Sequence, residues 1–314
     1  MQILNDTLLD LILGDPAVAR NLTAFPLLSK APAAADYLTL DEAMEQGGAV
    51  VSEVSEGGRV PELAFENKLD RKVLLLDGEE LIGAKQNRIL NLTILVAAGH
   101  KVTIPVSCVE HGRWSYRSRR FSSGKKKLYA SLKAKKMRAV SESLRRSGER
   151  RSDQGEIWDD IAFKCGRMGS ASETGCMDAL YEDHAPKMEE FVRSIRAADG
   201  QVGAVFMIGG RVVGLELFDS PATFARVLDK IVESFALDAI EYPEAGTAPP
   251  AREVAQAFLR KVAGARATAH TAVDLGQDVR LSAEQMEGGA LIADGRILHL
   301  SAFNLEEPDD ALIA

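Results

Sequence analysis

Two polar stretches of the sequence hold the residue types that could do chemistry. The first interrupts the apolar runs of residues 74–96, LLLDGEELIGAKQNRILNLTILV, and the second is residues 108–120, CVEHGRWSYRSRR. Two carboxyl groups in different surroundings can have pKa values far apart, which suits general acid–base catalysis. Glu80 and Glu110 are therefore the candidate catalytic residues. For Glu80 and its neighbour Glu79, the alternative is a solvated pair of acids behind the turn Asp77-Gly78.

Guanidinium groups, amides and aromatic rings of the same two stretches suit a phosphorylated, planar ligand. Arginine forks bind phosphate oxygens through paired hydrogen bonds, and Trp or Tyr rings stack on bases or ribose. The candidate ligand-binding residues are Lys85, Gln86, Asn87, Arg88, Arg113, Trp114, Tyr116, Arg119 and Arg120. The alternative is an Arg-rich edge strand whose side chains bond the excess acids of the chain.

Cys108, with His111 nearby, could be a thiol nucleophile if a base lay within hydrogen-bond reach. Period-2 alternation argues against this, because Cys108 shares a strand face with Val102, Ile104 and Val106. We therefore predict a buried, unpaired thiol that reacts slowly with thiol reagents.

The two polar stretches are predicted to meet in a hairpin of residues 88–96 and 102–110. A two-residue turn would set Val106 opposite Asn91, whereas a three-residue loop sets Val106 opposite Leu92. The longer loop keeps one face wholly apolar, so we expect that register.

The expected register carries a prediction about one pair of charges. It sets Arg88 directly opposite Glu110 on the same face of the hairpin. We therefore expect these two side chains to form a partly desolvated pair. The polar residues 85–88 and 110–116 would then form one wall.

The composition limits the class of protein. The chain has 314 residues, of which 46% are apolar and 27% are charged, as in globular proteins. No apolar run approaches the roughly 20 residues of a membrane span, and the N-terminus lacks the basic region of a signal peptide. We expect a cytoplasmic protein without a membrane partner. Three cysteines without a CxxC pair and five histidines without ligand spacing imply no disulfide framework, metal or cofactor.

A strongly basic segment interrupts this acidic chain. Residues 113–151 contain fifteen Lys or Arg and two acids, a local balance of +13. Because the net charge is −8, the remainder carries −21. Such a block implies a polyanionic partner or pairing with the chain's own acids. No nucleic-acid-binding motif is present, which argues against nucleic acid. We favour a solvated helical face or an acidic surface of another subunit, and hence a homo-oligomer.

The order of the elements indicates an α+β fold. We expect mainly antiparallel sheet in the N-terminal and C-terminal parts, with a helical, basic middle segment. The parts are residues 20–121, 122–198 and 199–304. No long flexible linker separates them, so we predict a single integrated domain over residues 1–314.

Local patterns predict the individual elements. Strands are expected in the first part at residues 21–28, 49–55, 62–69, 72–78, 88–96 and 101–109. Helices are expected at the N-terminus and at residues 40–47, 125–146, 157–164 and, introduced by Pro186, 188–198. In the last part we expect hairpins with turns at Gly209-Gly210 and Asp294-Gly295. We also expect a helix with Ser220 as N-cap and Pro221 at its first position, the Pro-rich break EAGTAPPA (244–251), and a helix at 252–264.

Several long motifs resemble one known family. They are DGEELIGAKQNRILN (77–91), IPVSCVEHGRWSYRSRRF (104–121), SDQGEIWDDI (152–161) and GGRVVGLELFDSP (209–221). These motifs are similar to the ARG and Rhodanese-Phosphatase-superfamily-associated Protein domain, in which ARG abbreviates ADP-ribosylglycohydrolase. The resemblance extends from about residue 21 to residue 303. It implies an association with enzymes that handle ADP-ribose and phosphoesters, and it carries over no catalytic residue.

Two functions are compatible with these observations. The first is a binding or catalytic domain for a phosphorylated nucleotide-like small molecule, linked to NAD or ADP-ribose metabolism. The second is a non-enzymatic, oligomeric interaction or scaffold domain whose polar cluster is structural. A panel of NAD, ADP-ribose, nucleotides and sugar phosphates separates the two, because only a binding site is stabilised by its ligand.

Overall fold

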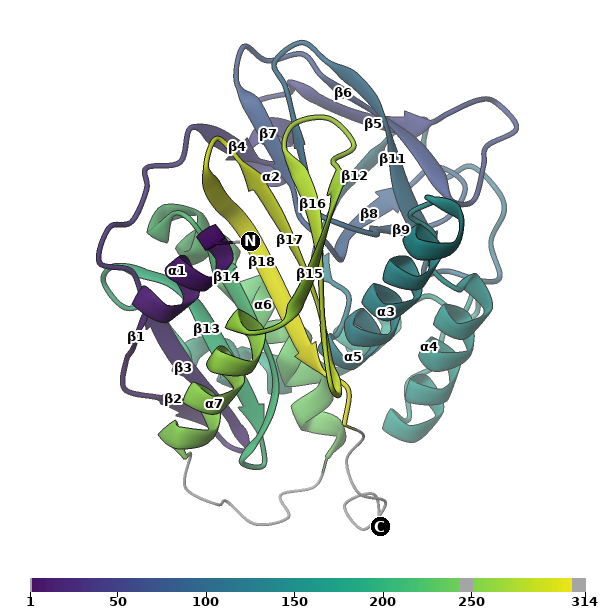
Figure 1. Cartoon of the computed structure of the whole chain (residues 1–314). Coiled ribbons are helices and arrows are strands. Elements are labelled where there is room, and N and C mark those ends of the chain that lie inside the picture. The colour runs from purple at the N-terminus through teal and green to yellow at the C-terminus, as the bar shows by residue number, and fades with distance from the viewer. Residues whose placement is uncertain (1, 243–250, 307–314) are drawn as a thin grey trace.

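A nine-stranded antiparallel sheet occupies the centre of the computed structural model, which describes residues 2–242 and 251–306 (Figure 1). Eight strands follow the order β1-β3-β13-β14-β18-β17-β16-β15, and β2 also pairs with β3. The first and last parts of the sequence therefore share one sheet. Its strands are β1 (Ile12–Leu13), β2 (Ala17–Ala19), β3 (Leu22–Leu28), β13 (Gln201–Ile208), β14 (Arg211–Phe218), β15 (Arg266–Thr271), β16 (Gln277–Ala283), β17 (Met286–Ala293) and β18 (Arg296–Asn304).

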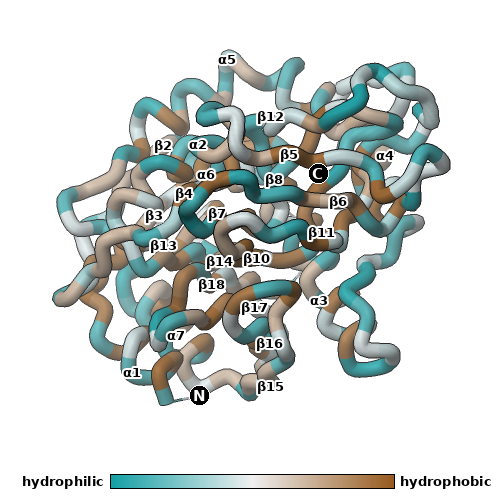
Figure 2. The backbone as a smooth tube through the Cα atoms, turned by 90° about the horizontal axis from the view of Figure 1, so that it is seen from above, coloured by the Kyte–Doolittle hydropathy of each residue, from teal (hydrophilic) through white to brown (hydrophobic). Residues whose placement is uncertain are grey.

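Six further strands close into a barrel in the order β11-β6-β5-β12-β8-β9. They are β5 (Ala49–Glu53), β6 (Glu62–Asn67), β8 (Glu79–Gly83), β9 (Arg88–Leu90), β11 (Lys101–Cys108) and β12 (Phe121–Lys127). A three-stranded sheet contains β4 (Tyr37–Thr39), β7 (Lys72–Leu75) and β10 (Ile94–Val96). Figure 2 shows β7 and β10 between the barrel strands and the large sheet.

Helices cover both faces of the large sheet. In β13, Val205 packs in the apolar core formed with α1 and α7, whereas its neighbour Phe206 packs in the core formed with α3, α4, α5 and α6. Successive residues of a strand point to opposite faces, which explains the two cores. A third core fills the barrel. The helices are α1 (Gln2–Asp10), α2 (Leu40–Glu45), α3 (Ala130–Ser147), α4 (Gln154–Met168), α5 (Asp178–Ser194), α6 (Pro221–Glu241) and α7 (Arg252–Ala263).

The α+β prediction is confirmed, and local chemistry explains several predicted elements. α2 begins with a capping box in which Thr39 and Glu42 bond each other's backbone N–H. The turn between β17 and β18 has positive φ at both Asp294 and Gly295, as a type I′ turn requires. α6 starts with Ser220 as N-cap, although that side chain makes no capping hydrogen bond.

The predicted strand 88–96 is wrong, because this segment divides between two sheets. β9 pairs with β11 in the barrel, and β10 pairs with β7, so that Ile94 lies opposite Leu75. Neither proposed register occurs, since Val106 lies opposite Leu90. All residues from 88 to 96 are buried, so no solvent-facing side existed to set the register.

Two predicted helix starts also differ from the structure. Pro186 lies inside α5 rather than at the start of a helix. The predicted helix 125–146 begins only at Ala130, because Lys125–Lys127 complete β12, which pairs with β8. The break 244–251 falls outside the described residues, except for Ala251. In the described part of the chain, no helix is both long and apolar enough to cross a membrane.

Candidate functional site

Three loops meet at one end of the barrel and carry most of the predicted site residues. Adjacent barrel strands are antiparallel, so the connections 54–61, 84–87 and 109–120 emerge at the same end. Side chains join them: Lys85 Nζ donates to Gly57 O at 2.5 Å, and Tyr116 Oη donates to Glu56 O at 3.1 Å. We call these three loops, with the strand ends beneath them, the barrel end.

Arg88 lies at the base of the barrel end and is completely buried. It shares a strand face with Leu90, which packs in the barrel core, and it pairs with Cys108 of β11. Its Nη1 donates to Gln86 Oε1 at 2.9 Å, while Nε and Nη2 are buried without a hydrogen-bond partner among the described residues. Burial lowers the pKa of Arg88 below its ordinary value, because the charged form loses its hydration.

The predicted Arg88–Glu110 pair is wrong, because Arg88 lies opposite Cys108. Glu110 instead binds Arg113 in a bidentate pair, with Nε–Oε1 at 2.8 Å and Nη2–Oε2 at 2.6 Å. It also accepts hydrogen bonds from Asn87 N and Thr174 Oγ1. Burial by itself raises the pKa of Glu110, but these donors outweigh burial and hold the pKa below its ordinary value.

Residues 85–88 and 110–116 nevertheless contact each other. Gln86 Nε2 donates to Glu110 O at 2.9 Å, and Arg113 Nη2 reaches Asn87 Oδ1 at 3.2 Å. The expected wall therefore exists, although Arg113 rather than Arg88 holds the carboxylate.

Aromatic rings cover the cations of the barrel end. Lys85 Nζ lies 5.0 Å from the ring centroid of Trp114 and 5.1 Å from that of Tyr116. The guanidinium carbon of Arg88 lies 5.7 Å from the Trp114 ring. Such contacts stabilise a cation through the electron-rich ring face. Trp114 is 48% exposed and Tyr116 is 51% exposed, so both rings also offer surface to a ligand.

The last two predicted ligand-binding residues lie farther along the same loop. Arg119 and Arg120 are exposed, in contrast to the buried Arg113. Arg117 Nη2, in the same loop, lies 3.7 Å from Glu110 Oε1. The loop 109–120 thus carries one buried arginine and several solvated ones.

Glu80 lies on the outside of the barrel and is completely buried, so a solvated turn is the wrong description of it and of Glu79. Burial, the nearby Asp178 and the more distant Glu110 raise the pKa of Glu80 well above its ordinary value. Asn87 Nδ2 donates to Asp178 Oδ2 at 3.0 Å, and this bond connects the surroundings of Glu80 to the barrel end. The two candidate carboxyls therefore differ: the surroundings of Glu80 favour its protonated form, and those of Glu110 favour its ionised form.

The burial of Cys108 agrees with its prediction as a buried, unpaired thiol. Cys108 is buried and free, as expected, and burial raises its pKa. Its Sγ lies 3.2 Å from Glu110 O. Within residues 2–242 and 251–306, no three His, Cys, Asp or Glu side chains are arranged to hold a metal ion.

A second polar group was not predicted and lies between the barrel and the large sheet. Lys133 Nζ binds Glu216 Oε1 at 2.5 Å, and Lys136 binds Asp77 and the Leu90 carbonyl. We call the group the central ion cluster; its members are Asp77, Lys127, Lys133, Lys136, Glu216 and His299, and each of them is nearly or fully buried.

Lys127 differs from the other lysines of the central ion cluster in its hydrogen bonding. Lys127 Nζ has no hydrogen-bond partner among the described residues. Burial and the nearby Lys133 lower the pKa of Lys127 to about 8. Burial also lowers the pKa of Lys136 to about 8, despite its bond to Asp77.

Sequence signals for this cluster existed. Lys133 and Lys136 are one helical turn apart and flank the apolar stripe of α3. Glu216 and His299 each stand within a run of apolar strand residues. Charged residues at apolar positions are almost never buried unless they are paired, so a buried network could have been inferred.

A family model agrees with these observations. The model of the ARG and Rhodanese-Phosphatase-superfamily-associated Protein domain matches residues 10–303. The chain belongs to this family. The barrel end and the central ion cluster both lie inside the family domain, since all their residues fall between 10 and 303. No curated protein and no solved structure matches the chain.

Proposed function

We propose that the barrel end binds a phosphorylated, nucleotide-like small molecule of the NAD or ADP-ribose type. The observation that carries the proposal is Arg88, whose Nε and Nη2 are buried without a hydrogen-bond partner in the part of the chain that the structure describes. An unsatisfied buried donor costs free energy, and an uncompensated charged one costs more, so an anionic acceptor there would be stabilising. The arginine fork matches phosphate oxygens in geometry.

Neighbouring groups complete the proposed binding site. Lys85 supplies a second cation for a phosphate, and Trp114 and Tyr116 supply half-exposed rings for a base. Because Trp114 covers Arg88, a phosphate reaches the guanidinium only when this ring moves aside. Ligand binding is therefore expected to change the fluorescence of Trp114.

The roles of the two carboxyl groups follow from their surroundings. Glu110 already accepts from Arg113, Asn87 and Thr174, so within this proposal it orients Arg113. Burial raises the pKa of Glu80 and so favours its protonated form, which is the form a general acid needs. Catalysis by Glu80 and Glu110 remains a prediction of the sequence.

The alternative is a scaffold domain, for which the charge imbalance was the main argument. Much of the basic segment is paired inside the chain. Its pairs are Lys126–Glu233, Lys133–Glu216, Lys135–Asp160, Lys136–Asp77 and Arg150–Asp278. This pairing favours the binding function over an acidic partner surface. A cytoplasmic location stays part of the proposal. The homo-oligomer stays a prediction of the sequence, and the internal pairing weakens the charge argument for it.

A thermal-shift panel tests the proposal. We expect NAD, ADP-ribose or a related phosphate at a hundred times its dissociation constant to stabilise the protein by about 2.7 kcal/mol. Trp114→Ala removes a half-exposed ring, so it should abolish the ligand shift while leaving the melting temperature of the free protein nearly unchanged.

A matched control is Phe163→Ala, which removes a ring that is 63% exposed on α4 and keeps the ligand shift. The proposal fails if no phosphate in the panel stabilises the wild-type protein. It also fails if Trp114→Ala and Phe163→Ala bind the ligand equally well.

A further inference from the structure

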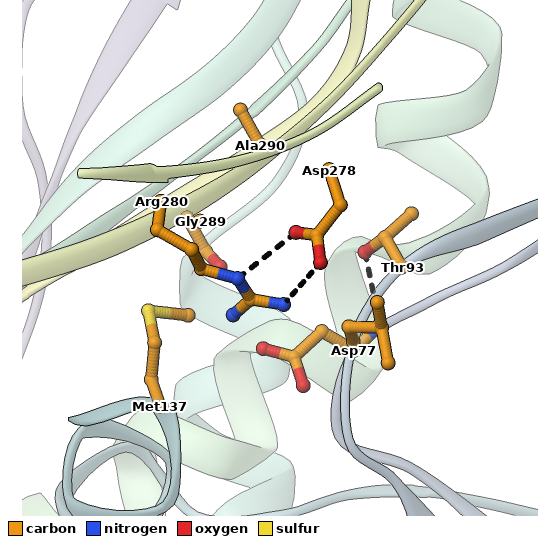
Figure 3. Close-up of a pocket in the computed structure, with 9 residues that line it drawn as sticks. Asp77, Thr93, Met137, Asp278, Arg280, Gly289 and Ala290 are labelled. Carbon is orange, nitrogen blue, oxygen red and sulfur yellow. Dashed lines mark hydrogen bonds and ion pairs between the residues drawn. The ribbon is translucent and has the colours of Figure 1, made fainter. Parts of the chain in front are cut away.

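Two cavities of the structure differ greatly in size. The cavity beside Thr93 has a volume of only about 10 Å³, which is close to the least that one water molecule needs. Figure 3 shows its Arg280 guanidinium turned toward Asp278, with Nη2–Oδ2 at 3.1 Å and Nε–Oδ1 at 2.9 Å. This cavity is therefore too small for an organic ligand.

The second cavity lies where three helices meet, and we call it the helix-end cavity. Its volume of about 380 Å³ is in the range of about 300–1,000 Å³ that small-molecule sites have. The last residues of α4 and α6 line it, together with His184 and Lys187 of α5. We propose that the helix-end cavity binds a small carboxylic acid with an apolar body, as a ligand site separate from the barrel end.

Three half-buried side chains supply the apolar part of this site. Met168, Ile240 and Tyr242 line the cavity, and all three pack on the edge of the apolar core that α4, α5 and α6 share. Each of them is only partly buried, so apolar surface remains for a ligand. Removing such surface from water stabilises a complex in proportion to its area.

The ion pairs of the cavity wall leave one cation over. Glu241 binds both Lys164 and Arg167, and Lys164 Nζ also lies 2.7 Å from Asp238 Oδ1. These two cations and two carboxylates balance one another. Lys187 is exposed and has no hydrogen-bond or ion-pair partner among residues 2–242 and 251–306. The charge that the cavity offers to a ligand is therefore the positive charge of Lys187.

Two further groups of the wall are neutral at neutral pH. Burial and the nearby Lys187 lower the pKa of His184, so its ring carries no charge. Burial and the nearby Asp238 raise the pKa of Tyr242, so its phenol keeps the proton and can donate it in a hydrogen bond. A carboxylate beside Lys187 would thus find a cation and a neutral donor.

The ends of the two helices act in the opposite direction. The C-terminal end of a helix carries a partial negative charge, which favours a cation. At α6 the Asn21 amide donates to two carbonyls of the helix end, at 2.9 and 3.3 Å, and at α4 the backbone N–H of Gly169 caps the last turn. These donors reduce the partial charges, whereas Lys187 keeps a full one. The cavity therefore favours an anion over a cation.

The helix-end cavity is far from the barrel end. Gln154, the first residue of α4, bonds to the backbone of Cys108 in the barrel, whereas Met168, the last residue of α4, lines the cavity. A helix of 15 residues is about 22 Å long, so one small ligand does not occupy both sites.

The test titrates phenylacetate into the full chain, with methionine labelled by carbon-13 in its methyl group. We expect the methyl resonance of Met168, assigned through Met168→Leu, to shift and saturate. The resonance of Met286, in the core on the other face of the large sheet, should not shift. Phenylacetamide and phenethylamine have a similar apolar body without the negative charge. Each should bind about tenfold more weakly or worse, because the bond to the charged lysine is lost.

Variants identify the cation. Lys187→Gln removes the charge from an exposed side chain and should weaken phenylacetate binding about tenfold or more. Tyr242→Phe removes only the hydroxyl and should weaken binding by a smaller factor. Lys101→Gln is the control, because Lys101 is an exposed lysine on β11, and it should bind phenylacetate like the wild type.

Three outcomes would overturn the proposal. In the first, the Met168 resonance does not saturate with phenylacetate. In the second, phenethylamine binds as tightly as phenylacetate, which would mean that the helix ends select a cation. In the third, Lys187→Gln and Lys101→Gln bind phenylacetate equally well. The ligand carries no phosphate, so each outcome is independent of the thermal-shift panel for the barrel end.

Discussion

At the scale of single residues, two glutamates near the barrel end have opposite electrostatic surroundings. Glu110 faces Arg113, Asn87 and Thr174, which all donate to it. Glu80 is buried near a second carboxyl group, Asp178, which raises its pKa. One carboxyl is therefore stabilised as an anion, and the other as a neutral acid.

We expect Glu80→Gln to become more stable than the wild type as the pH rises. A carboxyl whose pKa is raised on folding favours the folded state fully below its ordinary pKa of 4.5. That contribution is lost as the pH rises through the higher folded pKa, by about 1.4 kcal/mol per pH unit between the two values. Gln resembles the protonated acid and does not titrate. Urea unfolding of both proteins at pH 5 and pH 8 measures the difference.

The control for this prediction is Glu66→Gln, because the Glu66 side chain is 42% exposed. Its stability relative to the wild type should change little between the two pH values. A Glu80→Gln variant that is less stable than the wild type at pH 8 would show that Glu80 is ionised in the folded protein.

Single residues were only partly predictable. Alternation with Val106 was enough to predict a buried Cys108. The burial of Glu80 was missed, because the turn Asp77-Gly78 is ordinarily solvated. What covers Glu80 includes Asp178, about a hundred positions later in the sequence. Local sequence patterns therefore predicted which strand face Cys108 occupies, but they could not predict which distant residue lies over Glu80.

At the scale of elements, α5 contains an unusual proline. Pro186 lies in the middle of the helix and is exposed. Proline has no backbone N–H for the helical hydrogen bond, and its ring crowds the preceding turn. We expect Pro186→Ala to raise the free energy of unfolding by about 1–3 kcal/mol, measured by urea denaturation.

The neighbouring Lys187→Ala is the matched control, since this residue is also exposed on α5. It should change stability by less than about 0.5 kcal/mol. If Pro186→Ala destabilises the protein, the proline must fit a distortion of α5 that other contacts require.

Elements with their own start and stop signals were predictable. The turns Gly209-Gly210 and Asp294-Gly295 defined two hairpins, because few other residues accept positive φ there. The segment 88–96 offered no such signal. Its polar residues Asn91 and Thr93 bond the Arg150 carbonyl and His299, and these distant partners take the chain out of the barrel.

At the scale of the whole molecule, buried polar contacts connect the barrel to the large sheet. Lys136 of α3 binds Asp77, just before β8 of the barrel, and Lys133 of the same helix binds Glu216 of β14. Thr93, between β9 and β10, binds His299 of β18. A buried charge that loses its partner is strongly destabilising. Unfolding of the barrel or of the large sheet would therefore destabilise the other.

We expect the barrel and the large sheet to unfold together in urea, as the predicted single domain requires. Trp114 belongs to the barrel end, and Trp158 packs against His111 with the two rings tilted and their centroids 4.4 Å apart, so tryptophan fluorescence reports on this region. Far-UV circular dichroism reports on all helices and strands. The two curves should have the same midpoint. A fluorescence transition at lower urea would mean that the barrel unfolds as a separate unit.

The position of β18 has a consequence for synthesis on the ribosome. β18 is the last described strand along the chain, yet it fits between β14 and β17 in the sheet. Translation runs from the N-terminus, so β14 leaves the ribosome long before its neighbour and exposes an unpaired edge in the meantime. Unpaired edges pair readily with other chains. The nascent protein therefore passes through a stage at which one edge of β14 is unpaired, and that stage ends only when β18 closes the gap.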